Sequence, residues 1–171
     1  ASIWFEKAAE QGHLSAQYNL GVLCVQGFGV DKDFAQAAKW FRKAADQGDL
    51  TSQYNMGIFF RNGLGVPLDQ SESLRYFASA ASQGDPRAQF HLGQSILEGD
   101  SIEQNLPEAY LWIKLSAAQG NKDARALLDE LTPTMSPEDL FQGRLLNAER
   151  GDAEDQFQVA MGYTTGHGIK T

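Results

Sequence analysis

The residues of this chain best suited to chemistry are three histidines, one cysteine and several closely spaced carboxylates. Histidines bind metals or transfer protons, and paired carboxylates can serve as a general acid and base. His13, His91 and His167 lie far apart in the sequence, without an HExxH motif or a Cys–His spacing that would predict a metal site. Asp31 and Asp33 flank a lysine in a stretch typical of an exposed loop, where little desolvation would shift a carboxylate pKa. Neither set of residues indicates catalysis or metal binding.

Cys24 is the only cysteine, so the chain itself can form neither a disulfide nor a multi-cysteine metal site. It stands at a position that Phe60 and Ile96 fill in similar stretches, which favours burial over reactivity. No strand pattern precedes the paired glycines and no GKS or GKT follows them, so we interpret them as turns rather than phosphate loops: Gly27/Gly29, Gly63/Gly65 and Gly166/Gly168. We therefore expect no cofactor, and an enzyme is only a remote alternative.

A repeat of 36 residues organises the chain. The segments WFEKAAEQG at 4–12 and WFRKAADQG at 40–48 are nearly identical. Aligning on this period predicts three full copies, the end of a preceding copy, a shortened copy and a partial one: 13–48, 49–84 and 85–120, then 1–12, 121–151 and 152–171. We expect one continuous array over 1–171 that is a fragment of a longer array.

Each copy is predicted to hold two helices. The first halves read AQYNLGVLCVQG, SQYNMGIFFRNG and AQFHLGQSILEG, with apolar residues spaced by four on one side. The residues predicted to cap the N-termini of first helices are Asp49, Asp85, Asn121 and Asp152, and those of second helices are Asp33, Asp69, Asn105 and Ser136. Glycines that favour a left-handed turn close the second helices at Gly48, Gly84, Gly120 and Gly151.

Small and aromatic residues predict how these helices pack. Gly21, Gly57 and Gly93 lack a side chain where the two helices of a copy should cross. Aromatic and apolar side chains at recurring positions should fill the space between copies: Trp4, Trp40, Tyr76 and Trp112, with Phe5, Phe41, Phe77 and Ile113, and also Tyr18, Tyr54, Phe90 and Phe157. A single helix pair cannot bury both of its faces, whereas stacked pairs can, which predicts an all-α solenoid of antiparallel helix pairs.

The stretch AQYNLGVLCVQGFGVDKDFAQAAKWFRKAADQG and its successor resemble the SEL-one-like repeat (SLR), a relative of the tetratricopeptide repeat. The resemblance implies a right-handed α-solenoid whose first helices line the concave side. It also implies an adaptor in protein complexes, as in endoplasmic-reticulum quality control or bacterial envelope, signalling and host-interaction systems. The fourth copy departs from the pattern, with LTPTMSPED and Asp129 in place of the helix-crossing glycine, so we expect it to pack irregularly and bend the stack.

One stripe on the first helices favours an interaction. It combines Asn, Gln and Thr with scattered apolar residues, and asparagine can bond a peptide backbone without demanding a sequence. The predicted partner-binding residues are Asn19, Val22, Gln26, Asn55, Ile58, Asn62, Arg87, His91, Gln94 and Glu98. Few basic residues lie nearby to hold a terminal carboxylate, and a merely hydrated surface remains the alternative.

Charge and hydropathy restrict the partners. The net charge is −8, and the stretch 98–155 holds 13 acidic and 5 basic residues, which disfavours nucleic acid. No apolar run is long enough to predict membrane insertion, and no signal peptide is visible, which leaves the cytoplasm or a bacterial periplasmic or secreted location open. We expect a scaffold that binds a protein or extended peptide. The alternative is a structural element that self-associates end to end, because neither end shows a polar capping copy.

Overall fold

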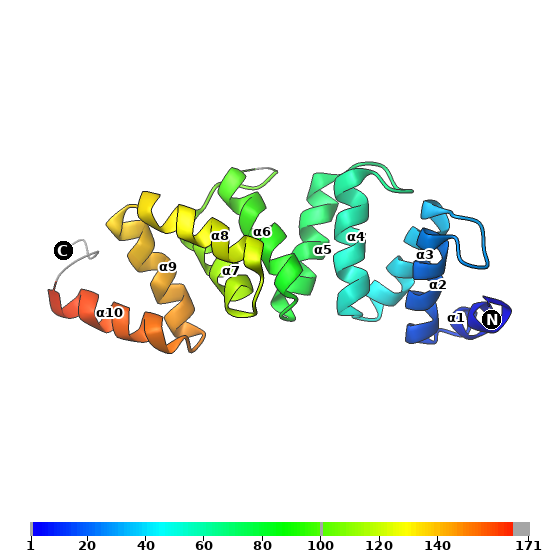
Figure 1. Cartoon of the computed structure of the whole chain (residues 1–171), viewed down its shortest axis with the longest axis horizontal. Helices are drawn as coiled ribbons and strands as arrows, with labels where there is room; N and C mark the ends of the chain where they lie inside the picture. Colours follow the sequence, from blue (N-terminus) through cyan, green and yellow to red (C-terminus); the bar gives the residue numbers. More distant parts are fainter. Residues whose placement is uncertain (1, 100, 166–171) are drawn as a thin grey trace. The chain divides into compact units, whose positions relative to one another are not determined.

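The computed structural model describes residues 2–99 and 101–165, which are all-helical, without a strand (Figure 1). This confirms the predicted all-α class. The helices are α1 (Ser2–Glu10), α2 (Leu14–Gln26), α3 (Phe34–Asp46), α4 (Leu50–Asn62), α5 (Gln70–Ser82), α6 (Pro86–Glu98), α7 (Leu106–Ala118), α8 (Lys122–Leu131), α9 (Pro137–Glu149) and α10 (Ala153–Thr165), with a short 3₁₀ turn, η1 (Thr132–Thr134), after α8.

Side-chain caps fix where these helices begin. The Asp33 carboxylate accepts hydrogen bonds from the backbone N–H groups of Ala35 and Gln36 at the start of α3, at 2.8 and 3.0 Å. Such caps satisfy N–H groups that have no partner within the helix. Equivalent caps confirm the predictions at Asp49, Asp69, Asn105, Asn121 and Ser136. The start of α2 is capped by His13, a role that the sequence analysis had not assigned.

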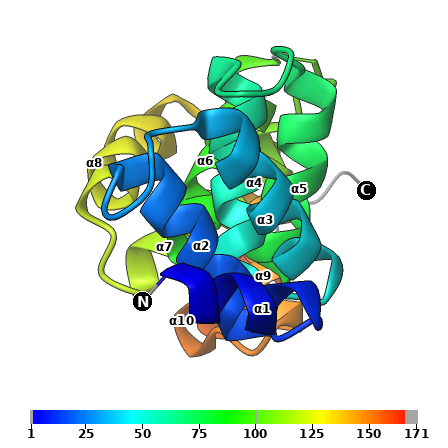
Figure 2. The same ribbon diagram turned by 90° about the vertical axis from the view of Figure 1, so that its right-hand side faces the viewer.

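The contacts divide the chain into two compact units, residues 1–85 and residues 86–171. In the first unit, α2 packs against α3 and α4 against α5 as antiparallel pairs (Figures 1 and 2). The helix α1 packs on α2, and α3 packs on α4, so each pair also covers its neighbour. The core between the two pairs draws on α2, α3, α4 and α5, with Phe41, Met56, Phe60 and Tyr76 among its buried side chains.

Glycines allow the two helices of a pair to approach closely. A Cβ atom on Gly21 would lie 2.6 Å from ring atoms of Phe41, and one on Gly57 would lie 2.5 Å from the ring of Phe77. In the second unit, a Cβ atom on Gly93 would lie 2.8 Å from Ile113. These distances confirm the prediction that the absence of a side chain is needed at each crossing.

The aromatic positions are confirmed inside the units and wrong at the outer helices. Phe41, Phe77, Tyr76, Trp112 and Ile113 are buried, and Trp40 is half-buried. In contrast, Trp4 on α1 is 74% exposed and Phe157 on α10 is 58% exposed, and Phe5 is also exposed. The physical reason is that α1 packs chiefly on α2, and α10 on α9, so the opposite face of each helix lacks a covering helix.

The fourth copy packs irregularly, as predicted. The helix α8 packs on α7, while the main contacts of α9 are with α7 and α10 rather than with α8. A glycine again makes the crossing possible, but it lies on the second helix of the copy. A Cβ atom on Gly143 would lie 2.8 Å from the ring of Tyr110 on α7. The shortened copy therefore replaces the usual pair by a direct contact between two second helices.

Candidate interaction surface

In the first unit, the predicted stripe lies on equivalent positions of α2 and α4. Asn19 and Asn55 are half-buried, as are the apolar members Val22 and Ile58. Val22 packs against the core cluster that includes Met56, Phe59 and Phe60 of α4. The remaining members on these two helices, Gln26 and Asn62, are exposed. The stripe therefore presents amide groups and partly accessible apolar side chains above a buried core.

Two amide groups of the stripe bond to the backbone of their own helices. The Nδ2 atom of Asn19 donates to the carbonyl oxygen of Ser15 at 2.7 Å, and that of Asn62 donates to the carbonyl oxygen of Ile58 at 2.9 Å. Each bond uses a donor, and the side-chain oxygen of an asparagine is a separate acceptor. Bonds of this kind hold an amide in place, which reduces the entropy that it loses when a partner binds.

In the second unit, the predicted members lie on α6. Arg87 and Glu98 are exposed, whereas His91 and Gln94 are half-buried. The Nε2 atom of Gln94 donates to a carboxylate oxygen of Glu98 at 2.9 Å, and the ring of His91 lies 5.5 Å from that of Phe90. This part of the stripe is more charged than the part on α2 and α4, so it differs in the partner chemistry that it would suit.

A ladder of paired glutamines was missed by the sequence analysis. Gln17 and Gln47 are joined by a side-chain hydrogen bond of 2.7 Å, Gln53 and Gln83 by one of 2.6 Å, and Gln89 and Gln119 by one of 2.9 Å. The first member of each pair is buried in the first helix of its copy, and the second member ends the second helix. The sequence could have revealed the ladder, because the two glutamines of each pair recur at equal positions of the repeat.

The ladder also ties successive copies together. The Nε2 atom of Gln17 donates to the carbonyl oxygen of Ala9 at 3.0 Å, and that of Gln53 donates to the carbonyl oxygen of Ala45 at 3.4 Å. Each bond links a first helix to the end of the preceding second helix, where carbonyl groups lack a partner within the helix. The role of these glutamines is therefore structural.

A buried ionic cluster in the second unit was also missed. The Nζ atom of Lys114 on α7 lies 2.5 Å from a carboxylate oxygen of Asp155 and 3.2 Å from one of Asp152. Burial raises the pKa of Asp155 despite the attraction of Lys114. Burial alone would lower the pKa of Lys114, but the hydrogen bond and charge of Asp155 outweigh it and raise that pKa. The cluster joins two copies, and no other copy has an acidic residue at the position of Asp155, so the repeat pattern does not mark it.

The other reactive side chains have structural surroundings. Cys24 is buried, as predicted, and burial together with the charges of Asp33 and Glu6 raises the pKa of its thiol, which disfavours the reactive thiolate. The glycine pairs 27/29 and 63/65 adopt positive φ angles between 64° and 74°, as the turn interpretation predicts. His167 and the pair 166/168 lie outside the described residues. Within the described ranges, no group of three or more His, Cys, Asp and Glu is arranged to hold a metal ion.

The family comparison covers most of the chain. A family model described as Sel1 repeat matches residues 3–13, 14–49, 50–85 and 86–121. No curated protein matches the chain. In the part of the chain that the structure describes, no helix is long and apolar enough to cross a membrane.

Two solved structures are similar to the chain. The crystal structure of c5321, a protective antigen present in uropathogenic Escherichia coli strains displaying an SLR fold, is 34% identical, with a TM-score of 0.74 over 98% of this chain. A Sel1 repeat protein from Oxalobacter formigenes is 30% identical, with a TM-score of 0.70 over 94% of this chain. The chain spans 37% of the length of the first protein and 68% of the second.

Proposed function

The chain belongs to the Sel1 repeat family, and on this premise we propose that it is a protein–protein interaction scaffold that binds a partner segment along the concave face of its first helices. Sel1 repeat proteins generally mediate interactions between proteins and are typically not enzymes. The observation that carries the proposal is the equivalent placement of Asn19 with Val22 and of Asn55 with Ile58 on α2 and α4. Asparagine amides supply both donor and acceptor groups to a peptide backbone. The half-buried apolar residues supply contact area beside them.

Photo-crosslinking can test this surface. A photoreactive amino acid at Val22 or Ile58 should capture a discrete set of proteins in a lysate of the source cells, and the same amino acid at Ser71, exposed on α5, should not. The double substitution Asn19→Ala/Asn55→Ala should abolish this capture, because it removes both backbone-bonding amides. The control Ser71→Ala/Ser82→Ala should leave it unchanged. Equal capture from both faces, or capture that survives the asparagine substitutions with the helical content intact, would count against the stripe.

Self-association is the second candidate function, and the exposed apolar side chains of the outer helices favour it. Ile3 and Trp4 are 64% and 74% exposed on α1, and Phe157 and Tyr163 are each 58% exposed on α10. Large apolar side chains that are exposed together on one helix are candidates for an interaction site. Sedimentation over a range of concentrations should then show association that Trp4→Glu or Phe157→Glu reduces. A monomer at every concentration would exclude this candidate.

A further inference from the structure

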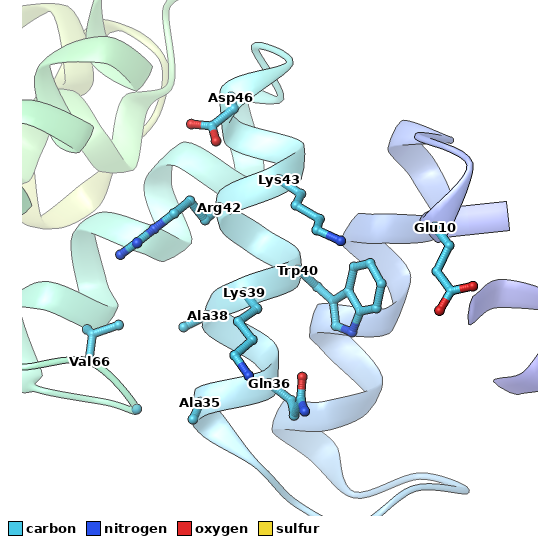
Figure 3. A pocket seen from close by; sticks show the side chains of 11 residues that line it. Glu10, Ala35, Gln36, Ala38, Lys39, Trp40, Arg42, Lys43, Asp46 and Val66 are labelled. Atoms are coloured by element: carbon cyan, nitrogen blue, oxygen red, sulfur yellow. The ribbon is translucent and has the colours of Figure 1, made fainter. Parts of the chain in front are cut away.

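A groove of about 550 Å³ runs along the outward side of α3 (Figure 3). It is lined by Lys39, Trp40, Arg42 and Lys43 of α3, with Glu10 of α1 at one border and Gly65 and Val66 at the other. Figure 3 shows Trp40 and Lys43 on the side of α3 that is nearer Glu10, and Arg42 on the side nearer Val66. The groove lies on a second helix, so it is formed by residues other than those of the stripe.

Its three basic side chains make no close ion pair, although the charge of Arg42 contributes to the lowered pKa of Glu72. Among residues 2–99 and 101–165, no ion pair within 4.0 Å involves Lys39, Arg42 or Lys43. Two of them contact aromatic rings instead. The Nζ atom of Lys43 lies 4.3 Å from the centre of the Trp40 ring, and the guanidinium of Arg42 lies 5.6 Å from that of Phe60. A cation held over an aromatic face can still attract an anion from the solvent side.

The next copy has a basic residue at the equivalent position, but there it is paired with a carboxylate. Arg75 on α5 aligns with Lys39, and it makes an ion pair of 2.7 Å with Glu72 one turn earlier. The hydrogen bond from Arg75 lowers the pKa of Glu72, as expected for a carboxylate held in its charged form. In the first full copy, Gln36 stands in place of Glu72. This difference removes from α3 the negative charge that would pair with Lys39. Glutamine and glutamate have nearly the same shape, so the packing is kept.

We propose that the α3 groove binds an acidic segment of a protein partner, which places carboxylates on Lys39 and Lys43. Four residues of helix separate the two lysines by about 6 Å along the axis. Two residues of an extended chain span a similar distance, about 6.6 Å. The segment that fits best therefore has two acidic residues separated by one other residue, whose side chain points away from α3 because successive side chains of an extended chain alternate. Arg42, on the other side of α3, would attract further negative charge.

Nucleic acid fits the groove less well. Glu10 and Asp46 line it together with the basic residues, and carboxylates at its border repel a continuous phosphate backbone. Residues 1–85 hold 9 acidic and 7 basic residues, so the surrounding surface offers no extended positive track. A short segment with a few carboxylates can keep them away from Glu10 and Asp46. The continuous phosphate backbone of a nucleic acid cannot.

Fluorescence anisotropy with a fluorescein-labelled peptide can test the proposal. The probe carries two Glu-Ser-Glu units in a Gly/Ser context, and the matched probe has Gln in place of each Glu. The acidic probe should bind the full chain at low salt, more weakly as salt rises, and the Gln probe should not. Lys39→Gln/Lys43→Gln should weaken binding roughly three- to tenfold, as expected for the loss of two solvent-exposed charge pairs.

The controls separate this surface from others. Arg75→Gln removes a cation that is already paired, so it should leave the affinity unchanged. Asn19→Ala/Asn55→Ala should also leave it unchanged, because the stripe lies on other helices. Equal binding of the Glu and Gln probes would overturn the proposal, as would unchanged affinity in the double lysine variant with helical content intact. Single-stranded DNA of equal charge binding as tightly as the acidic probe would also overturn it, because it would reveal a general polyanion surface.

Discussion

The contact between Lys114 and Asp155 places two charged groups where little water reaches them. The Asp155 side chain is 2% exposed and that of Lys114 is 18% exposed, so each ion loses most of its hydration. Such a pair is stable only as a pair, because removal of one partner leaves a buried charge without compensation. Tyr110 and Arg144 lie close enough for the pKa of Tyr110 to be affected by Arg144 and Asp155, although burial is the main cause of its rise. The helix α7 is therefore held to α10 by charge.

Lys114→Met should lower the free energy of unfolding by about 3–5 kcal/mol at neutral pH. The loss should shrink as pH falls, because the pKa of Asp155 is raised in the folded state and its protonation then favours folding. Urea denaturation at pH 8 and pH 4.5 measures both quantities. Lys122→Met, at an exposed position of α8, is the matched control and should change stability little. A loss that is the same at both pH values would contradict the assigned role of Asp155.

At the scale of elements, the crossing of paired helices depends on missing side chains. Gly21 and Gly57 each face an aromatic ring of the second helix, and the ring fills the volume that a side chain would occupy. The rings themselves pack further into the core, where Phe41 contacts Phe59 edge to face with 5.5 Å between the ring centres. The glycine, the ring and the next first helix thus form one continuous packing unit.

Gly57→Ala should destabilise the protein by about 1–3 kcal/mol, because the added methyl group overpacks a filled crossing. This is the reverse of the usual effect, since alanine in a helix interior is more favourable than glycine by about 1 kcal/mol. Thermal or urea unfolding measures the change. Thr51→Ala, at a half-exposed position of the same helix, is the control and should be close to neutral. Stabilisation of the Gly57→Ala variant would show that Phe77 can move aside at low cost.

Much of this element-level structure could be predicted because its signals are local and recur. Helix caps such as Asp33 and the glycines at the crossings follow from residue type and period alone. The packing of α9 on α7 could not be predicted, because it arises where the period is broken and only the three-dimensional contacts place Gly143 against Tyr110. The Lys114–Asp155 pair could not be predicted either, because only the three-dimensional contacts bring these two residues together. The stripe could be located on the first helices, but its binding role stays a prediction.

At the scale of the whole chain, residues 1–85 and 86–171 form two compact units with different charge. The first holds 9 acidic and 7 basic residues, and the second holds 13 acidic and 7 basic residues. In repeat proteins, stability is the sum of terms within copies and between neighbours, so cooperativity can be lost where one region is weakened. The two units are therefore expected to respond separately to a change in one of them.

Lys114→Met should split urea unfolding into two transitions, because it weakens only the second unit. Trp112 lies in that unit, whereas Trp4 and Trp40 lie in the first. Fluorescence of a Trp112→Phe background then reports on the first unit, and a Trp4→Phe/Trp40→Phe background reports on the second. The Trp112 signal should change at lower urea than the Trp40 signal. Gly57→Ala should reverse that order, and signals that always coincide would show that the chain unfolds as one cooperative body.

The glutamine ladder has a consequence for how such a chain can change its length. Gln53 must meet Gln83 across a helix pair, so one residue inserted within either helix would turn the following side chains by about 100° and part the two amides. Insertion of a whole copy preserves every pairing. The shortened fourth copy agrees with this rule, since Arg125 and Arg150 occupy both of its ladder positions. The protein can therefore gain whole copies without losing a glutamine pair. An insertion shorter than a copy is tolerated only where the pair is already absent, as in the fourth copy.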